Sequence, residues 1–216
     1  MNIKFLDNTK EISEAFINCF VMSWDEFQVK QKDWIAKMAE SNYPITIDWY
    51  EKAYMWDKMN PDFPNASMEV ALAFLKEHSG PVYFMTEKGE DTYYQGKKLV
   101  DFIAEADAHT LAARIEQEWY DSYRLAEQNM YDADAFLPED LYVFDASMKW
   151  CVVFTHETTD WESEIDNPMK TAQTRYCFIW LFGNNYIIVY VEVCVLLCEM
   201  GYLCEVFYDD AVVHRL

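Results

Sequence analysis

The sequence predicts an α+β protein in which helices come first and a mostly antiparallel sheet follows. Two observations carry this prediction. Through the first 80 residues, apolar side chains recur at spacings of three and four, which is the period of a helix with one buried face. From residue 81 onward the period shortens to two in short runs bounded by turn residues, as in strands. One long central helix, expected over 107–129, interrupts these strands.

The helical part contains four expected helices. Their ranges are 9–22, 25–42, 48–59 and 68–78. The last helix has the clearest ends. Ser67 precedes it as a helix-capping residue, and Gly80 and Pro81 stop it.

The sheet part, residues 81–216, contains the expected strands. Their ranges are 82–86, 92–94, 99–105, 141–145, 150–156, 175–182, 186–195 and 202–207. We expect 141–145 to pair with 150–156, and 175–182 to form a hairpin with 186–195. A polar, acidic connection is expected over 158–171.

Length and composition predict one domain over 1–216. A chain of 216 residues with 52% hydrophobic residues can bury a full core without disulfides. The apolar stretch 178–198 is interrupted by Gly183 and Glu192, among others, and is rich in strand-forming residues, so we expect no membrane span. The start carries no signal-peptide pattern and cysteines are few, which predicts a cytoplasmic protein with reduced thiols. The cysteine-containing apolar segment 178–206 indicates no role of its own.

Negative charge is concentrated in one part of the chain. The formal net charge is −21, from 38 Asp and Glu against 17 Lys and Arg. Residues 101–166 hold 17 acids and 3 bases, so they carry −14 of this total. Such a field disfavours direct binding to nucleic acids and anionic membranes, because like charges repel. It favours a basic protein partner, although excess acid also suits a merely soluble surface.

The acidic block predicts a non-enzymatic binding protein that neutralises or regulates a basic partner. Size and charge resemble those of immunity-type proteins and nucleic-acid mimics, by analogy alone. Exposed aromatic side chains among carboxylates suit the recognition of Lys and Arg. The expected binding surface consists of Glu116, Glu118, Tyr120, Asp121, Tyr123, Asp132, Asp134, Asp160, Trp161, Glu162 and Glu164.

Two alternatives stay open. His156 and Glu157 end an expected strand beside the acidic connection, and they are candidates for acid–base chemistry in a hydrolase-type enzyme. Adjacent strand residues point to opposite faces, so the side chains of His156 and Glu157 do not meet directly. We therefore expect the carboxylate that assists His156 to come from the acids of 157–167. Carboxylates in that run could also bind a divalent cation, with Asp160, Glu162, Glu164 and Asp166 as candidate ligands.

No phosphate loop, nucleophile elbow or cofactor motif is present in the sequence, so no cofactor is expected, and no pattern indicates an oligomeric state.

Three segments resemble a family of small proteins of unknown function from Gram-positive gut bacteria. They are Tyr93-Tyr94-Gln95-Gly96-Lys97-Lys98, Leu137-Pro138-Glu139-Asp140-Leu141-Tyr142-Val143-Phe144-Asp145 and Trp150-Cys151-Val152-Val153-Phe154-Thr155-His156-Glu157. The resemblance covers about residues 80–180. It implies no activity, so it assigns no role to any residue.

Overall fold

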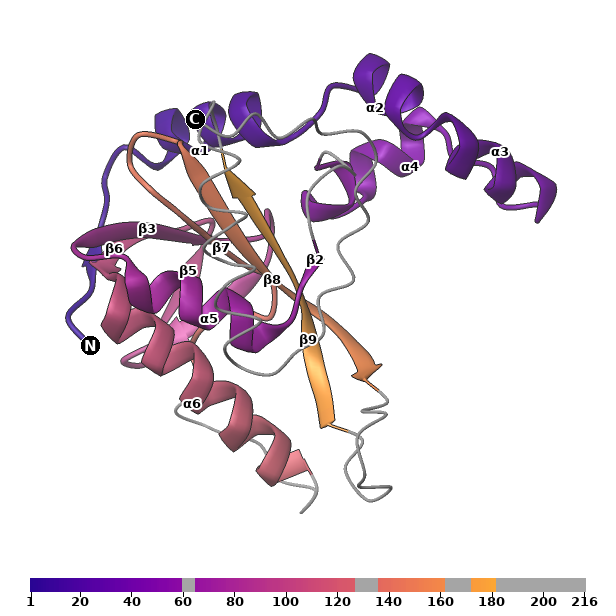
Figure 1. The fold of residues 1–216 in the computed structure, drawn as a ribbon. Helices are drawn as coiled ribbons and strands as arrows, with labels where there is room; N and C mark the ends of the chain where they lie inside the picture. Colours follow the sequence, from indigo (N-terminus) through magenta and orange to yellow (C-terminus); the bar gives the residue numbers. More distant parts are fainter. Residues whose placement is uncertain (60–64, 127–135, 162–171, 182–216) are drawn as a thin grey trace, which may run out of the picture. The chain divides into compact units, whose positions relative to one another are not determined.

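The computed structural model describes residues 1–59, 65–126, 136–161 and 172–181 (Figure 1). The chain divides into two compact units, Met1–Phe182 and Gly183–Leu216, and every described residue lies in the first. The strands expected at 186–195 and 202–207 therefore lie outside the described residues. One domain over the whole chain stays a prediction.

An antiparallel sheet organises the described part of the chain. Seven of the described strands form it in the order β1-β6-β3-β7-β8-β9-β2, and all neighbouring pairs are antiparallel. These strands are β1 (Lys4–Phe5), β2 (Asn65–Ala66), β3 (Pro81–Thr86), β6 (Ile103–Asp107), β7 (Leu141–Phe144), β8 (Trp150–Trp161) and β9 (Ala172–Leu181). The strands β4 (Asp91–Tyr94) and β5 (Lys97–Val100) form a separate hairpin.

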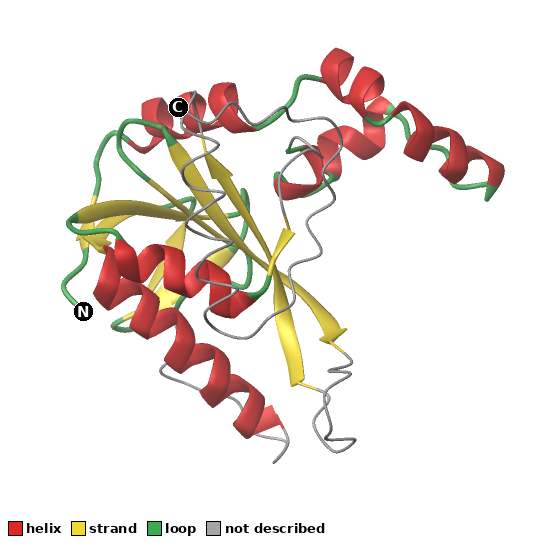
Figure 2. Ribbon diagram, in the orientation of Figure 1, coloured by secondary structure: helices red, strands yellow, loops and turns green. Residues whose placement is uncertain are grey.

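All described helices but one precede β3, and the two-residue strands β1 and β2, which the sequence did not predict, lie in this helical part. Figure 2 shows the helices and the sheet coloured by type. The described helices are α1 (Thr9–Phe20), α2 (Trp24–Lys30), α3 (Lys32–Glu40), α4 (Ile47–Lys52), the 3-10 helix η1 (Trp56–Lys58), α5 (Met68–Glu77) and α6 (Ala108–Ala126). Ser67 caps α5 through its side chain, as expected. The predicted α+β class, with N-terminal helices and one long central helix, is confirmed.

The core lies on both faces of the sheet. On one face, Phe16 of α1 packs on the rings of Tyr142 and Phe144, with ring centroids 5.7 and 4.9 Å away. On the other face, Phe74 of α5 lies 5.3 Å from the ring of Trp150. Because both faces are covered, all four residues of β7 are buried.

The structure corrects several expected boundaries. The helix expected over 25–42 is two helices, α2 and α3, separated at Gln31. The helix expected over 48–59 ends at Lys52, and η1 follows it. The strand expected over 99–105 is divided into β5 and β6, because Asp101 has a positive φ of 47° and turns the chain.

The sheet also extends further along the sequence than expected, and the expected pairing of 175–182 with 186–195 lies outside the described residues. The connection expected over 158–171 begins as strand, because β8 continues to Trp161 after an irregularity between Phe154 and Thr158. The partner of this extension is β9, with Thr158 opposite Arg175. Strand β9 therefore pairs with the strand before it.

A smaller cluster of apolar residues joins the short helices. Phe27 of α2 and Ile45 are buried in it, and the ring of Trp49 lies 5.9 Å from that of Phe27. Ser23 begins α2 with a capping box, in which Ser23 and Glu26 bond each other's backbone N–H groups. Helices this short depend on such packing and capping for their stability.

We expect replacement of Phe16 by Ala to lower the free energy of unfolding by about 3–5 kcal/mol, because it empties the contact between α1 and the sheet. The control is Val29→Ala on α2, where the side chain is 77% exposed, and there the change should stay within about 0.5 kcal/mol. Urea denaturation measures both. Equal losses in the two variants would contradict the placement of α1.

Candidate functional site

A buried carboxylate joins the ends of two acidic segments. Asp140 ends the segment 132–140, directly before β7, and is 3% exposed. Its Oδ1 accepts a hydrogen bond from the backbone N–H of His156 at 3.0 Å, and its Oδ2 lies 2.9 Å from Nδ1 of the same residue. Because an ionised carboxylate can only accept, Nδ1 is the donor of this pair. Asp140 is therefore a carboxylate partner of His156 that the sequence did not predict, and the side chains of the acids expected in 157–167 lie outside the described part of the structure.

Strand register brings these two residues together. Leu141 of β7 lies opposite Phe154 of β8, so Asp140 reaches the backbone of β8 just past Phe154. The indole of Trp56, from η1, donates to Oδ1 of Asp140 at 3.1 Å. One carboxylate thus connects β7, β8 and the N-terminal helical part.

A second buried acid holds the same helical segment. Glu87, at the end of β3, accepts hydrogen bonds through Oε2 from the hydroxyl of Tyr142 and, at 2.8 Å, from the backbone N–H of Met55. The hydroxyl of Tyr142 in turn accepts from the backbone N–H of Trp56 at 3.1 Å. Burial raises the pKa of Tyr142 well above its ordinary value, and the negative charges of Glu87 and Asp140 raise it further.

A further acid, Glu90, lies near Asp140. Glu90 accepts from the hydroxyl of Thr86 at 2.8 Å and from the backbone N–H of Glu139 at 3.0 Å. Burial raises the pKa of Glu90, and the nearby charges of Asp140 and Glu139 act in the same direction. A lysine, Lys58, also lies near these acids. Its partial burial lowers its pKa, and the negative charge of Glu87 acts in the opposite direction.

Glu118 of α6 has a different role from the one expected. It was predicted on the outer surface of the helix, but it is 7% exposed. Its Oε2 accepts from the backbone N–H groups of Phe136 and Leu137 at 3.1 and 2.9 Å, and its other oxygen accepts from Nε of Arg114. Glu118 therefore fastens the end of the acidic segment 132–140 to α6 and is not available to a partner. Its position, three residues after buried Ile115, was the signal that could have revealed this.

The remaining candidate residues are placed as follows. Glu116 lies on α6, and its carboxylate is bonded to Lys76 of α5 at 2.8 Å, so its charge is partly compensated. Tyr120, Asp121 and Tyr123 belong to α6, and Glu157, Asp160 and Trp161 belong to β8, but their side chains lie outside the described part. Asp132, Asp134, Glu162, Glu164 and Asp166 lie outside the described residues.

Two aromatic residues beside Asp140 were missed as site residues. Tyr54 is 44% exposed, and its ring stacks on that of Trp56 with centroids 5.7 Å apart and planes 8° apart. The ring of Tyr54 also lies 5.0 Å from that of His156. The sequence predicts Trp56 on the apolar face of the expected helix 48–59. No spacing or motif in the sequence links this residue to Asp140 or His156.

The described residues show no helix long and apolar enough to cross a membrane, and no group of three or more His, Cys, Asp or Glu residues placed to hold a metal ion. The proposed cation ligands at 160–166 are not among the side chains described. Cys19 and Cys151 are free thiols. Burial raises the pKa of Cys151 well above its ordinary value, so this thiol is poorly suited to act as a nucleophile.

Comparisons of the chain with protein-family models, with curated protein sequences and with solved structures find no match. The function has to be argued from the residues themselves. The geometry supplies one pattern for this purpose. Within the described residues, Glu118 joins α6 to Phe136 and Leu137 of the segment 132–140, and Asp140 joins the last residue of that segment to His156, just before 157–167.

We expect Tyr142→Phe to lower the free energy of unfolding by about 1–3 kcal/mol near neutral pH, because buried Glu87 loses a donor and Trp56 loses an acceptor. This loss should shrink above about pH 10. There the unfolded wild type releases the proton of Tyr142 while the folded protein keeps it, so the stability of the wild type falls as the pH rises. Phenylalanine does not titrate, so the variant does not share this fall and the difference between the two proteins becomes smaller.

Urea denaturation from pH 7 to 11 measures this difference, with Tyr43→Phe, at an exposed tyrosine, as the control. A loss for Tyr142→Phe that stayed constant across this range would contradict the burial of the Tyr142–Glu87 pair.

Proposed function

We propose that the protein binds a basic protein partner and neutralises or regulates it. One observation carries the proposal: Glu118 bonds α6 to the backbone of Phe136 and Leu137, and Asp140 bonds the end of that segment to His156, which directly precedes the acidic run 157–167. Carboxylates gathered by the fold create a stronger local field than the same number spread over a surface. Such a field steers a cationic protein toward one face and speeds its association.

The aromatic pair beside Asp140 supplies an anchor for this partner. Tyr54 is exposed, and its ring and that of Trp56 lie next to His156 and the buried carboxylate. A Lys or Arg side chain that packs on an aromatic face gains a cation–π contact, and nearby acids add to the attraction. Tyr and Trp are also the residue types that most often dominate interface energies.

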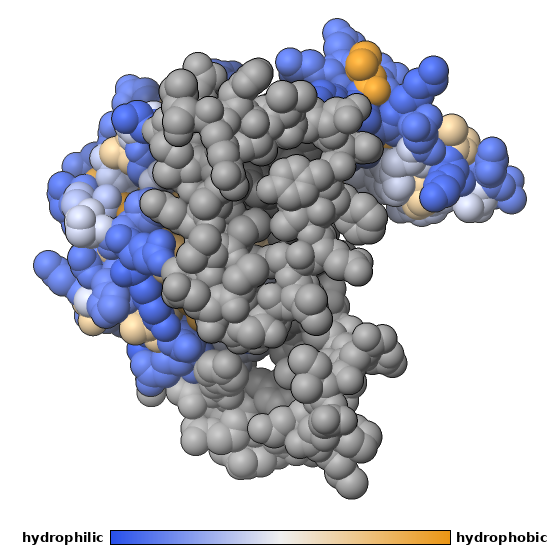
Figure 3. All heavy atoms as spheres, viewed as in Figure 1, coloured by the Kyte–Doolittle hydropathy of each residue, from blue (hydrophilic) through white to orange (hydrophobic). Residues whose placement is uncertain are grey.

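The surface of the described residues is consistent with a polar interface. On the face drawn in Figure 3, hydrophilic residues cover most of the described surface, and apolar residues occur singly or in small groups. A partner recognised on a surface of this kind would be held by charge and a few anchors, as in a transient or steered complex. An immunity-type or nucleic-acid-mimic role in the cytoplasm belongs to this proposal by analogy.

The test is capture of partners from a lysate of the native host at about 50 mM salt and elution at about 500 mM, followed by titration of the eluted protein. We expect basic proteins in the eluate. The double variant Tyr54→Ala/Glu139→Gln should weaken the complex roughly tenfold or more, because it removes the anchor and the exposed acid that precedes Asp140 in sequence.

The matched control is Tyr43→Ala/Glu40→Gln, which makes the same chemical changes at exposed positions at the end of α3. It should change affinity less than about twofold. Binding that does not depend on salt, or equal weakening by both double variants, would refute the proposal.

A second candidate function is favoured by the bond between Asp140 and His156. A buried carboxylate that holds Nδ1 of a histidine orients the ring so that Nε2 can act as a general base, as hydrolytic enzymes require. We propose this only as the alternative, because the cavity formed by Met1, Tyr94, Arg114 and Phe136, among others, is not lined by His156.

We expect a protein of this second kind to hydrolyse p-nitrophenyl acetate faster than free imidazole does, and His156→Asn should remove the excess rate, since Asn has no basic ring nitrogen. Release of p-nitrophenol measures the rate, with His109→Asn, at an exposed position of α6, as the control. Equal rates for the wild type and His156→Asn would end the hydrolase interpretation.

A further inference from the structure

The exposed ring of Tyr54 is held in a fixed orientation. It lies parallel to the ring of Trp56, with planes 8° apart and centroids 5.7 Å apart. The indole of Trp56 donates to Asp140, and the imidazole of His156, 5.0 Å from the ring of Tyr54, is bonded to the same carboxylate. One buried acid therefore fixes both rings on which Tyr54 packs. A ring ordered in advance costs little entropy when a ligand packs on it.

The two acids bonded to the residues that follow Tyr54 have no cationic side chain as a partner. Glu87 accepts from the backbone N–H of Met55, and Asp140 accepts from the indole of Trp56. Their other donors are backbone, phenol and imidazole groups, and no Lys or Arg of the described residues bonds to either acid. A buried carboxylate solvated in this way still attracts a cation at the surface, because little water screens its charge.

One lysine beside these acids already packs on a different tyrosine. Nζ of Lys58 lies 5.2 Å from the centre of the ring of Tyr50, and the charge of Glu87 attracts this ammonium group. Within the described residues, no Lys or Arg lies over the ring of Tyr54 in this way. Tyr54 thus offers an aromatic face near the same negative charges to a cation from another molecule.

A flat, exposed ring favours a guanidinium over an ammonium group. A guanidinium is planar and weakly hydrated, so it can stack on an aromatic face while the N–H groups at its edge still donate to carboxylates or water. An ammonium is a compact, strongly hydrated charge, and it gives up more of its hydration to approach a ring.

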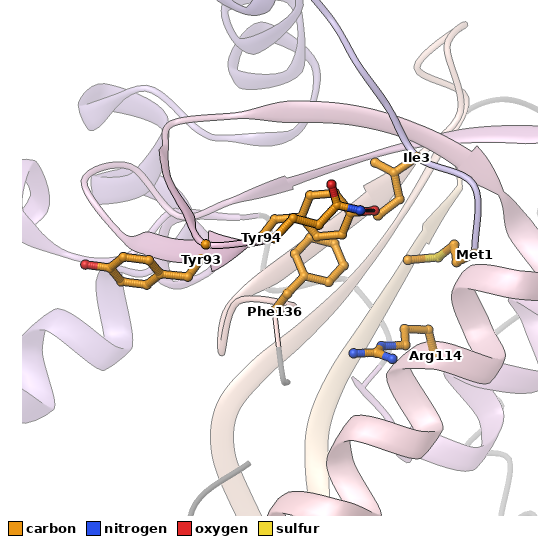
Figure 4. Close-up of a pocket in the computed structure, with 8 residues that line it drawn as sticks. Met1, Ile3, Tyr93, Tyr94, Arg114 and Phe136 are labelled. Atoms are coloured by element: carbon orange, nitrogen blue, oxygen red, sulfur yellow. Dashed lines mark hydrogen bonds between the residues drawn. The ribbon is translucent and has the colours of Figure 1, made fainter. Parts of the chain in front are cut away.

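We propose that Tyr54 binds an arginine side chain of the basic partner in preference to a lysine, with the guanidinium stacked on its exposed ring. This inference rests on the proposed function and names the side chain that the aromatic anchor selects. The contact lies on the surface and not in the cavity of Figure 4, which is lined by Tyr94, Arg114 and Phe136, among others, and not by Tyr54.

Two labelled peptides of equal charge, nona-arginine and nona-lysine, test the preference without a natural partner. Fluorescence anisotropy measures the affinity of each peptide for the full chain at about 50 mM and about 500 mM salt. We expect both peptides to bind at low salt and to weaken at high salt. The arginine peptide should bind about threefold or more tightly than the lysine peptide, because only its side chains stack on Tyr54.

Three variants assign this preference to the ring. Tyr54→Ala should lower the ratio of the two affinities by at least about half, whereas Tyr54→Phe keeps the ring and should keep the ratio. The control is Tyr43→Ala, which removes another exposed tyrosine and should leave the ratio unchanged. Thermal unfolding of each variant verifies that it is folded.

The outcomes separate this inference from the proposed function. Equal affinities for the two peptides, both falling with salt, overturn the preference for arginine and leave the proposed function standing. An unchanged ratio in Tyr54→Ala, or an equal loss in Tyr54→Phe and Tyr54→Ala, also overturns the inference alone. If neither peptide shows salt-dependent binding up to about 1 mM, the inference and the proposed function fail together.

Discussion

The buried carboxylate of Asp140 sets a constraint on the rest of the described structure. A charge removed from water is costly unless hydrogen-bond donors surround it. Asp140 has three kinds of donor: a strand backbone N–H, a histidine ring and a tryptophan indole. Each comes from a different place, so the register of β7 on β8 and the position of η1 must both be correct for the charge to be satisfied. Glu87 repeats this arrangement one strand away, where Met55 and Tyr142 are the donors.

Local patterns in the sequence predicted most of the elements but not their contacts. The Ser67 cap, the amphipathic α6 and the apolar runs of β3, β7 and β8 are determined within a few residues, and these predictions are confirmed. Helix breaks such as that at Gln31 were missed, because a break inside an apolar period leaves only a weak local signal.

The candidate site was harder to predict, because its residues meet only through tertiary structure. His156 was recognised, but its carboxylate partner lies 16 positions earlier and is brought near by strand register. Tyr54 and Trp56 lie further away in sequence, so no spacing rule joins them to the site. Glu118 was placed on the surface because its charge was given more weight than its helical phase. Carboxylates are often exposed, but one that receives two backbone N–H bonds and an arginine can be buried.

The length of β8 has a consequence for how the protein behaves at high concentration. Strand β8 has 12 residues, whereas its neighbour β7 has 4, so the outer half of β8 is paired within the described residues with β9 alone. Among the described residues no strand lies on the other side of this extension, and an unpaired strand edge is a place where another chain can pair. The segment contains Asp160 and leads into a run of acids, and like charges on two copies repel each other when their edges approach. Repulsion of this kind opposes strand-to-strand self-association, and it is weaker at high salt, where the charges are screened.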